Sequence, residues 1–342
     1  MTVVPLPSRR DPESGGQAGA ADLPAQAVSI RGLSKTYKGA GEMPPKTALK
    51  GVDLDIPRGS MFGLLGPNGA GKSTIINIMA GLVTKTAGSV KIWDFDIDTD
   101  RRRAKLAIGV VPQELNIDPH FTPKELLDLQ SSLYGLKPGE YRTWEALEVV
   151  GLTAEAHAYS RWLSGGMKRR LLIAKAILHA PPVVVLDEPT AGVDVELRQH
   201  LWTYVRELNA QGTTILLTTH YLEEAEKLCD TIAIIDRGEV IAREATGDLL
   251  RRVDSKEMTV TLTDDIAEMP YALGKYDVEL LPPRRLCFRF RRSQTQIGEI
   301  IAAIQSAGLT IADLTTAEGR LEDVFLEMTG KRAGARHDDD AP

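Results

Sequence analysis

Apolar residues gather in three short stretches near the start of the chain, at Ala27–Ile30, Val52–Ile56 and Met61–Leu65, and a strand fits all three. From Lys72 onward, segments with helical periodicity alternate with short apolar runs, and the run at 183–186 is continuously apolar, as in a strand that is covered on both faces. This alternation predicts a largely parallel sheet wrapped by helices.

The pattern also places the individual elements. Helices are expected to begin near Lys72, Pro123, Tyr141, Ser164, Val195 and Leu222. The strands expected after Lys72 are Val90–Trp93, Ala107–Val111, Val183–Asp187, Thr214–Thr218 and Thr231–Asp236. The region from about 113 to 180 is mostly helical in pattern, which indicates an inserted arm rather than part of the sheet.

A second unit is predicted from about Lys256. Its pattern favours the strand Met258–Leu262, a helix over Asp265–Gly274, a hairpin of Val278–Leu281 with Leu286–Phe290, a helix over Gln294–Ala307 and the strand Leu309–Leu314. This order resembles a small β-α-β-β-α-β module. The expected organisation is a disordered leader (1–26), a main domain (27–252), the small module (256–330) and a disordered tail (331–342).

Composition limits the class of protein. The 342 residues carry 41 basic and 47 acidic side chains, a net charge of −6, which argues against broad nucleic-acid binding. No apolar run approaches the roughly 18 residues that a membrane span needs, and the start lacks the apolar core of a secretory signal. Only Cys229 and Cys287 occur, which excludes a disulfide scaffold or a four-cysteine zinc site. We therefore expect a soluble intracellular protein.

A phosphate-binding pattern, G-x-x-x-x-G-K-S, follows the strand that ends at Leu65. Its residues are Gly66, Pro67, Asn68, Gly69, Ala70, Gly71, Lys72 and Ser73, and Thr74 comes next. The glycines allow backbone N–H groups to surround phosphate oxygens at a helix N-terminus. Lys72 is expected to reach the β- and γ-phosphates and Ser73 to ligate Mg²⁺. The alternative, a Gly-rich turn that caps a helix, is disfavoured by the strand-loop-helix context.

Two acidic residues end the continuously apolar strand. Asp187 is expected to hold Mg²⁺ through its water shell, because carboxylates at the carboxyl edge of such sheets face the ligand. Glu188 is the candidate general base that polarises the attacking water. Taken alone, the pair is typical of a strand-ending turn; beside a phosphate loop, the catalytic interpretation is favoured.

Further motifs identify a family. Leu163 and Met167 flank Ser164, Gly165 and Gly166, and the five residues resemble the signature of ABC-type ATPases. The family's other motifs follow in its order at Tyr37 (adenine-stacking aromatic), Gln113 (Q-loop), Ala191–Asp194 (D-loop) and His220 (switch histidine). Without the resemblance, Tyr37 is a core or rim residue and Gln113 and His220 are surface or cap residues.

The resemblance covers about residues 28–250 and extends to a subgroup. Met167 stands where the family most often has Gln, and Val193 where Leu is common. Neither change removes a phosphate-contacting hydroxyl or glycine N–H group. The tract from Lys168 to Arg198 and the closing LEDVFLEMTG (321–330) resemble ATPase subunits of type 2 exporters, a group that handles drugs, polyketides and lipo-oligosaccharides.

The resemblance implies a fold and a mechanism. The fold would be an α/β P-loop NTPase of the ABC type, with a mostly parallel core, an antiparallel β-subdomain, a helical arm and a small α+β C-terminal module. Each ATP would lie between the phosphate loop of one copy and the signature of another. The implied roles are adenine stacking by Tyr37, phosphate cradling by the backbone of 68–74, Mg²⁺ positioning by Ser73, Gln113 and Asp187, proton abstraction by Glu188, γ-phosphate contact by His220, and action in trans by Ser164 and Gly166.

The implied partners are a second copy and a separate multi-span permease, which would hold the chain at the cytoplasmic face of the cell membrane. Two alternatives stay open. A soluble ABC-fold switch on ribosomes or DNA is disfavoured, because such proteins generally carry two motif sets, a long coiled coil or zinc cysteines. An importer ATPase is disfavoured by the closing LEDVFLEMTG.

The role of the C-terminal module stays open: it is equally well an accessory dimerisation or regulatory unit or a packing extension. The basic stretch at 284–292 reads as a half-buried strand with a charged outer face, and contact with a lipid headgroup or a partner stays open.

Overall fold

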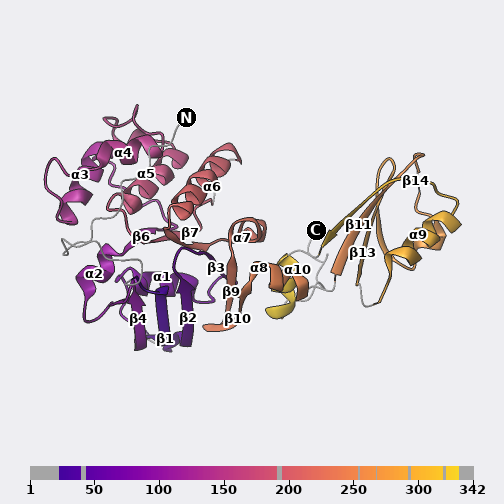
Figure 1. Ribbon diagram of the computed structural model, residues 1–342, viewed down its shortest axis with the longest axis horizontal. Helices are drawn as coiled ribbons and strands as arrows, with labels where there is room; N and C mark the ends of the chain where they lie inside the picture. The colour runs from indigo at the N-terminus through magenta and orange to yellow at the C-terminus, as the bar shows by residue number, and fades with distance from the viewer. Residues whose placement is uncertain are drawn as a thin grey trace. The chain divides into compact units, whose positions relative to one another are not determined.

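A computed structural model describes residues 23–39, 44–190, 195–252, 255–266, 268–291, 294–318 and 321–330 (Figure 1). The chain divides into two compact units, up to Arg243 and from Glu244 onward; the sequence pattern places the division about ten residues later. Most of the expected leader, the D-loop residues Ala191–Asp194 and the expected tail lie outside the described residues.

A six-stranded sheet forms the centre of the first unit. Its order is β10 (Glu239–Ala245), β9 (Thr231–Asp236), β3 (Met61–Leu65), β8 (Thr214–Thr218), β7 (Val183–Asp187) and β6 (Ile108–Val111). The pairs from β9 through to β6 are all parallel. Every residue of β3, β7 and β8 is buried, which explains the continuously apolar run at 183–186. The expected parallel core is confirmed.

A four-stranded antiparallel sheet packs near it. Its order is β2 (Lys46–Pro57), β1 (Gln26–Tyr37), β4 (Ala87–Ile92) and β5 (Phe95–Asp96). β1 and β2 extend beyond the predicted stretches, because register shifts along β1 interrupt the pattern without ending the pairing. Helix α1 (Lys72–Met79) contributes Ile75, Ile76 and Ile78 to one apolar core with residues of both sheets. The phosphate-loop helix is therefore fixed from two sides.

The remaining helices of the first unit are α2 (Arg101–Leu106), α3 (Pro123–Leu133), α4 (Thr143–Val149), α5 (Gly165–Ile177), α6 (Val195–Ala210) and α7 (Leu222–Leu228), with a 3₁₀ turn at Ser160–Trp162. Helices α3, α4 and α5 form the expected arm, on the opposite side of the central sheet from β1, β2 and β4 (Figure 1). The predicted helix starts agree with the structure to within two residues.

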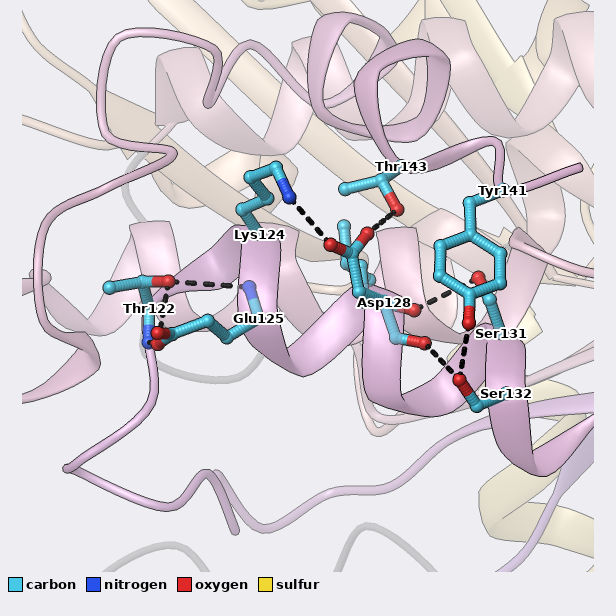
Figure 2. A network of polar contacts seen from close by, with 9 residues as sticks. Thr122, Lys124, Glu125, Asp128, Ser131, Ser132, Tyr141 and Thr143 are labelled. Carbon is cyan, nitrogen blue, oxygen red and sulfur yellow. Dashed lines mark hydrogen bonds and ion pairs between the residues drawn. The ribbon is translucent and has the colours of Figure 1, made fainter. Parts of the chain in front are cut away.

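Polar contacts join the helices of the arm (Figure 2). Thr122 and Glu125 form a capping box that begins α3. Asp128 on α3 then accepts hydrogen bonds from Lys124 and from the hydroxyl of Thr143, the first residue of α4. This partly buried network favours one packing of the two helices, because several side-chain bonds must form together.

The second unit is built on an antiparallel sheet. Its order is β12 (Asp277–Leu281), β13 (Arg285–Arg291), β11 (Ser255–Leu262) and β14 (Ile311–Glu318), and its helices are α8 (Thr246–Arg252), α9 (Ile297–Ser306) and α10 (Leu321–Met328). Met258, Phe288 and Ile300 are among the residues of its separate core, which α9 and one sheet face share.

One predicted element of this unit is wrong. In place of a helix over Asp265–Gly274, the described residues form only a 3₁₀ turn at Tyr271–Leu273. Pro270 explains the difference, since proline lacks the N–H that a helix interior needs and disfavours helical backbone at the preceding residue. The other predicted elements of the module are present in the predicted order along the chain, and α10 follows them.

The basic stretch of the second unit lies on β13. Leu286 and Phe288 are buried while Arg285, Arg289 and Arg291 are exposed, so the predicted charged outer face is confirmed. Arg289 lies 3.0 Å from Glu279 on β12 and 3.5 Å from Glu257 on β11. The acidic neighbours balance part of the positive charge of this face.

Among the described residues, no helix combines the length and the apolar character that crossing a membrane requires.

Candidate active site

The phosphate loop joins the end of β3 to the start of α1. Gly66 follows the buried strand directly, and a Cβ there would lie 2.2 Å from the carbonyl oxygen of Ile235, so only glycine fits. Gly71, the residue before α1, has a φ of 117°, in the left-handed region that side chains rarely adopt. The two glycines are thus required by the close approach of the backbone and by the turn into the helix.

The loop is also tied to the strands beside it. The N–H of Gly238, in the turn between β9 and β10, donates to the carbonyl of Ala70 at 2.9 Å, and the carbonyl of Gly238 accepts from Lys50 on β2 at 2.9 Å. These bonds fix the loop to both sheets of the unit. A preorganised backbone nest suits a ligand that is recognised through N–H groups.

Lys72 lies over this loop. Its Nζ donates to the carbonyls of Gly66 at 2.7 Å and Pro67 at 3.2 Å, and the residue is only 8% exposed. Burial lowers the pKa of the ammonium, and the nearby charges of Glu188 and Asp187 act in the opposite direction. The lysine is therefore held where a phosphate would meet it.

Ser73 and Asp187 come together beside the lysine. Asp187 ends β7 and is buried, and burial raises the pKa of its carboxyl. Hydrogen bonds from the hydroxyls of Thr218 and Ser73 and the charge of Lys72 oppose that shift in pKa. Two of the oxygens expected to hold Mg²⁺ are thus neighbours.

Two more of the predicted residues contact Glu188. Its Oε2 accepts from Nε2 of Gln113 at 2.9 Å and lies 3.4 Å from Nδ1 of His220. The side chain is only 13% exposed, and the backbone has a φ of 48°, an uncommon conformation for a residue other than glycine. The carboxylate that sequence analysis names as the base is therefore aimed by its backbone and by two side chains.

The residues of this site fit a magnesium ion bound with a phosphate ligand. Among the described residues, no group of three or more His, Cys, Asp or Glu side chains forms a metal cage. Mg²⁺ does not need one, because it usually takes one or two protein oxygens together with substrate phosphates and water. Ser73 and Asp187 supply such oxygens at the mouth of the loop.

The other two predicted site features are Ser164, with its glycines, and Tyr37, whose described contacts are local. Ser164 is the N-cap of α5, where its Oγ accepts from the N–H of Met167 at 3.2 Å, and the hydrogen bonds given for it stay within that helix. Ser164 and Gly165 are exposed. Tyr37 ends β1 with 38% of its surface exposed, and Nζ of Lys35 lies 4.7 Å from its ring centroid.

Comparison with known proteins decides the family. The ABC transporter family model matches residues 49–191. The linearmycin resistance ATP-binding protein LnrL of Bacillus subtilis is 36% identical over 298 residues, which cover 84% of this chain and 94% of that protein. The Nod factor export ATP-binding protein I of Ralstonia nicotianae is 35% identical, with 89% and 94% covered. The daunorubicin/doxorubicin resistance protein DrrA of Streptomyces peucetius is 32% identical, with 93% and 97% covered.

The chain belongs to the ABC transporter family, as an ATP-binding subunit. Solved structures agree. The ATP-binding subunit of an ABC transporter aligns with a TM-score of 0.60 at 30% identity, over 66% of this chain and 92% of that one. The dimeric cassette MJ0796 bound to ADP and Pi aligns with a TM-score of 0.58 at 31% identity, over 64% and 98%. The predicted family, the ABC-type P-loop fold and the ATPase class are confirmed.

The structure adds a residue to this ABC site that sequence analysis did not name. Thr218, fully buried at the end of β8, donates its hydroxyl to Oδ1 of Asp187 and accepts from the N–H of Glu188 at 3.1 Å. One hydroxyl thus joins both acids. The available signal was its place two residues before His220 on a strand that lies beside β7, but pairing between distant strands is not readable from a single sequence.

A second residue that sequence analysis missed is Arg169 on α5. This residue is 5% exposed, and its guanidinium donates to the carbonyl of Pro112, the residue before Gln113, at 2.8 Å. Burial lowers the pKa of the guanidinium, while the charges of Asp187 and Glu188 raise it. The arginine therefore connects the signature helix to the segment that carries the Q-loop glutamine.

Thr218→Val should impair hydrolysis while nucleotide still binds. The change removes a hydroxyl from Asp187 and leaves the N–H of Glu188 with one acceptor fewer, so we expect kcat to fall by about tenfold or more. Because this hydroxyl lowers the pKa of Asp187, its loss should raise that pKa. The acidic limb of the pH–rate profile should then move to higher pH, since the carboxylate must be ionised to hold a cation.

Thr214→Val is the matched control for this prediction. Thr214 is a fully buried threonine on the same strand, and its hydroxyl accepts from the N–H of Gly59 at 2.9 Å, away from the acids. Its loss should lower the melting temperature without moving the pH profile. If both variants shift the profile equally, Thr218 has no special part in the site.

Proposed function

We propose that this chain binds and hydrolyses ATP to energise a membrane export permease, with each ATP held between two copies of the chain. The observation that carries the proposal is the convergence of Gln113 and His220 on one oxygen of Glu188. Lys72 and the Ser73–Asp187 pair lie beside them. A poised base next to a phosphate loop and a cation site is the arrangement that phosphoryl transfer to water requires.

In the proposed mechanism, the backbone of residues 68–74 cradles the phosphates. Lys72 exchanges its bonds to the loop carbonyls for the stronger, charge-assisted bonds to phosphate oxygens. Ser73, Gln113 and Asp187 hold Mg²⁺, which neutralises charge on the phosphates when it is bound. Tyr37 stacks its exposed ring on the adenine base.

Glu188 then acts on the attacking water. Its carboxylate accepts the proton as the water oxygen bonds the γ-phosphorus, and the bond from that phosphorus to the β–γ bridging oxygen breaks, which releases ADP and phosphate. Gln113 orients the carboxylate through its 2.9 Å hydrogen bond. His220, whose Nδ1 lies 3.4 Å from the carboxylate, would contact a γ-phosphate oxygen.

A second copy of the chain would complete each site. Ser164, Gly165 and Gly166 begin α5, and N–H groups at a helix N-terminus bind anions well. The hydrogen bonds given for Ser164 stay within its own helix, and the residue is exposed, so it is available to a partner. Two copies that face each other would place each signature on the other's nucleotide.

The direction of transport follows from the relatives. These relatives are named for antibiotic resistance and Nod factor export, which favours export over the importer and over a ribosome- or DNA-bound switch. A separate multi-span permease would supply the pathway and hold the chain at the cytoplasmic face of the membrane. In this arrangement residues 27–252 would bind the nucleotide and residues 256–330 would form an accessory module.

Reconstitution tests the proposal. The chain is combined in lipid vesicles with a multi-span permease chosen from its gene neighbourhood, with ATP on the outside. We expect the permease to stimulate ATP hydrolysis and to carry a labelled amphiphilic drug into the vesicles, with no transport by the Glu188→Gln variant. Stimulation by ribosomes or DNA, and none by the permease, would contradict the proposal.

A further inference from the structure

Glu224 is a buried acidic residue to which the mechanism above gives no role. It lies in the first turn of α7, four residues after His220, and only 7% of its surface is exposed. A carboxylate removed from water is costly unless it is paired or hydrogen-bonded. Its partners therefore indicate why it is there.

Both hydroxyl partners of Glu224 come from the segments that carry the catalytic groups. Its Oε2 accepts from the hydroxyl of Thr190 at 3.0 Å and from the hydroxyl of Thr219 at 2.9 Å. Thr190 is two residues after Glu188, and Thr219 is the residue before His220. Both threonines are buried, at 1% and 3% exposure. One oxygen therefore fastens the base-bearing segment and the histidine-bearing segment to the same point.

Further contacts continue from Thr219 and Glu224 to the surroundings of His220. The hydroxyl of Thr219 also accepts from the N–H of Tyr221 at 3.0 Å, which shapes the turn that presents the histidine. The ring of Tyr221 lies 4.0 Å from the ring of His220 and has the guanidinium of Arg198 4.7 Å from its centroid. Nε of Arg198 lies 3.5 Å from the other oxygen of Glu224.

A purely local role does not account for these contacts. An acidic residue in the first turn of a helix is favoured by the helix dipole and often bonds the N-cap backbone. Oε2 of Glu224 instead receives side-chain hydroxyls from outside α7. Its neighbour Glu223, also in the first turn, is 75% exposed and pairs only with Lys227 among the contacts given for it. Of these two acidic neighbours, Glu224 is the one whose side chain connects the helix to the catalytic segments.

We propose that Glu224 is a positioning residue for ATP hydrolysis, which sets the separation of Glu188 and His220 through Thr190 and Thr219. This inference rests on the proposed function, since it concerns the same hydrolytic site. A shared carboxylate keeps Nδ1 of His220 within 3.4 Å of Oε2 of Glu188. The alignment of the two groups then depends on a residue that touches neither of them.

The first test compares Glu224→Gln with Glu223→Gln in the full-length chain. In Glu224→Gln, the new NH₂ group must face either the two threonine hydroxyls or Arg198. The hydroxyl of Thr219 already accepts a hydrogen bond from the N–H of Tyr221. In both orientations the charge-assisted bonds of the carboxylate are lost. We expect kcat for ATP to fall about tenfold or more, with the Kd for ATP changed by less than about twofold. Glu223→Gln should match the wild type.

The second test uses the threonines, and it stands even if Glu224→Gln does not fold. Thr219→Val should lower kcat as Glu224→Gln does, and Thr219→Ser, which keeps the hydroxyl, should restore it. The double variant Glu224→Gln/Thr219→Val should be little worse than either single variant, because both changes break the same link.

Two results would overturn the inference. One is a wild-type kcat in Glu224→Gln and Thr219→Val. The other is a loss of ATP affinity and melting temperature in proportion to kcat without recovery in Thr219→Ser, which would make Glu224 a structural residue. Wild-type protein and Glu188→Gln are assayed in parallel. A wild type that does not hydrolyse ATP would count against the proposed function itself rather than against the part assigned to Glu224.

Discussion

Glu188→Gln is expected to abolish steady-state ATP hydrolysis while leaving ATP binding intact. The amide is close in shape to the carboxylate and can still accept from Gln113, so the surroundings of the phosphate loop are preserved. It cannot accept a proton from water, and removal of a general base typically slows a reaction by about 10²- to 10⁴-fold. Phosphate and Mg²⁺ contacts through Lys72, Ser73 and Asp187 do not involve the substituted group.

The measurement pairs turnover with oligomeric state. If ATP joins two copies and hydrolysis separates them, the Glu188→Gln protein should elute as a dimer from a sizing column in the presence of ATP and as a monomer without it. Glu114→Gln offers a control nearby, since Glu114 is exposed and hydrogen-bonds only Asn116 among the contacts given for it. A Glu188→Gln protein that no longer binds ATP would show that Glu188 supports the loop rather than the chemistry.

The sequence predicted the site well because its residues lie in local motifs with fixed geometry. The phosphate loop is a continuous stretch between a strand and a helix, and the acids Asp187 and Glu188 end a continuously apolar strand. Such features depend on neighbours in the chain. Gln113 and His220 carried no local pattern of their own, and their convergence on Glu188 was expected only through the family resemblance.

What the sequence did not predict depends on contacts between distant segments. Thr218, Arg169 and Glu224 each have a partner that is distant in the chain, 31, 57 and 34 residues away, respectively. Their types, a threonine in a strand and charged residues on helices, are ordinary for their elements. Burial distinguishes them, since each is at most 7% exposed, and burial of a polar side chain depends on how the elements pack.

In the second unit, the pattern of apolar residues predicted the sheet but not the segment between its first two strands. Strand alternation predicted its sheet, because one face packs on α9 and the other is polar. The helix predicted over 265–274 is wrong. Ile266, Met269 and Leu273 pack in the core of this unit without an α-helix. Apolar spacing alone could not distinguish that arrangement from a helix, and Pro270 was the evidence against one.

Mixing two inactive variants should restore activity if each ATP site is shared between copies. Lys72→Ala removes the ammonium that bridges the loop carbonyls and is expected to meet the γ-phosphate, so it disables the phosphate loop of its own copy. Ser164→Arg replaces the N-cap of α5 and places bulk and charge at the exposed signature. Each variant alone forms dimers in which both sites are broken.

A mixed dimer differs, because one site collects both defects and the other pairs an intact loop with an intact signature. Random exchange of equal amounts makes about half of the dimers mixed, so about a quarter of the wild-type number of sites should be whole. Coupling between the sites would lower the rate below that fraction. Lys72→Ala mixed with itself after the same exchange is the control, since it can form no intact site.

The outcome separates a shared site from one that is complete within a single chain. ATPase activity well above that of either variant, after subunit exchange, requires Ser164 of one copy to act on the nucleotide of the other. Activity no higher than the separate variants, with mixed dimers demonstrated, would count against independent shared sites but would fit two sites that fire only together. A cysteine crosslink between position 164 and the phosphate loop of the other copy then decides. Its ATP-dependent formation supports the two-copy site, and its absence means that the signature of this chain does not reach a second nucleotide.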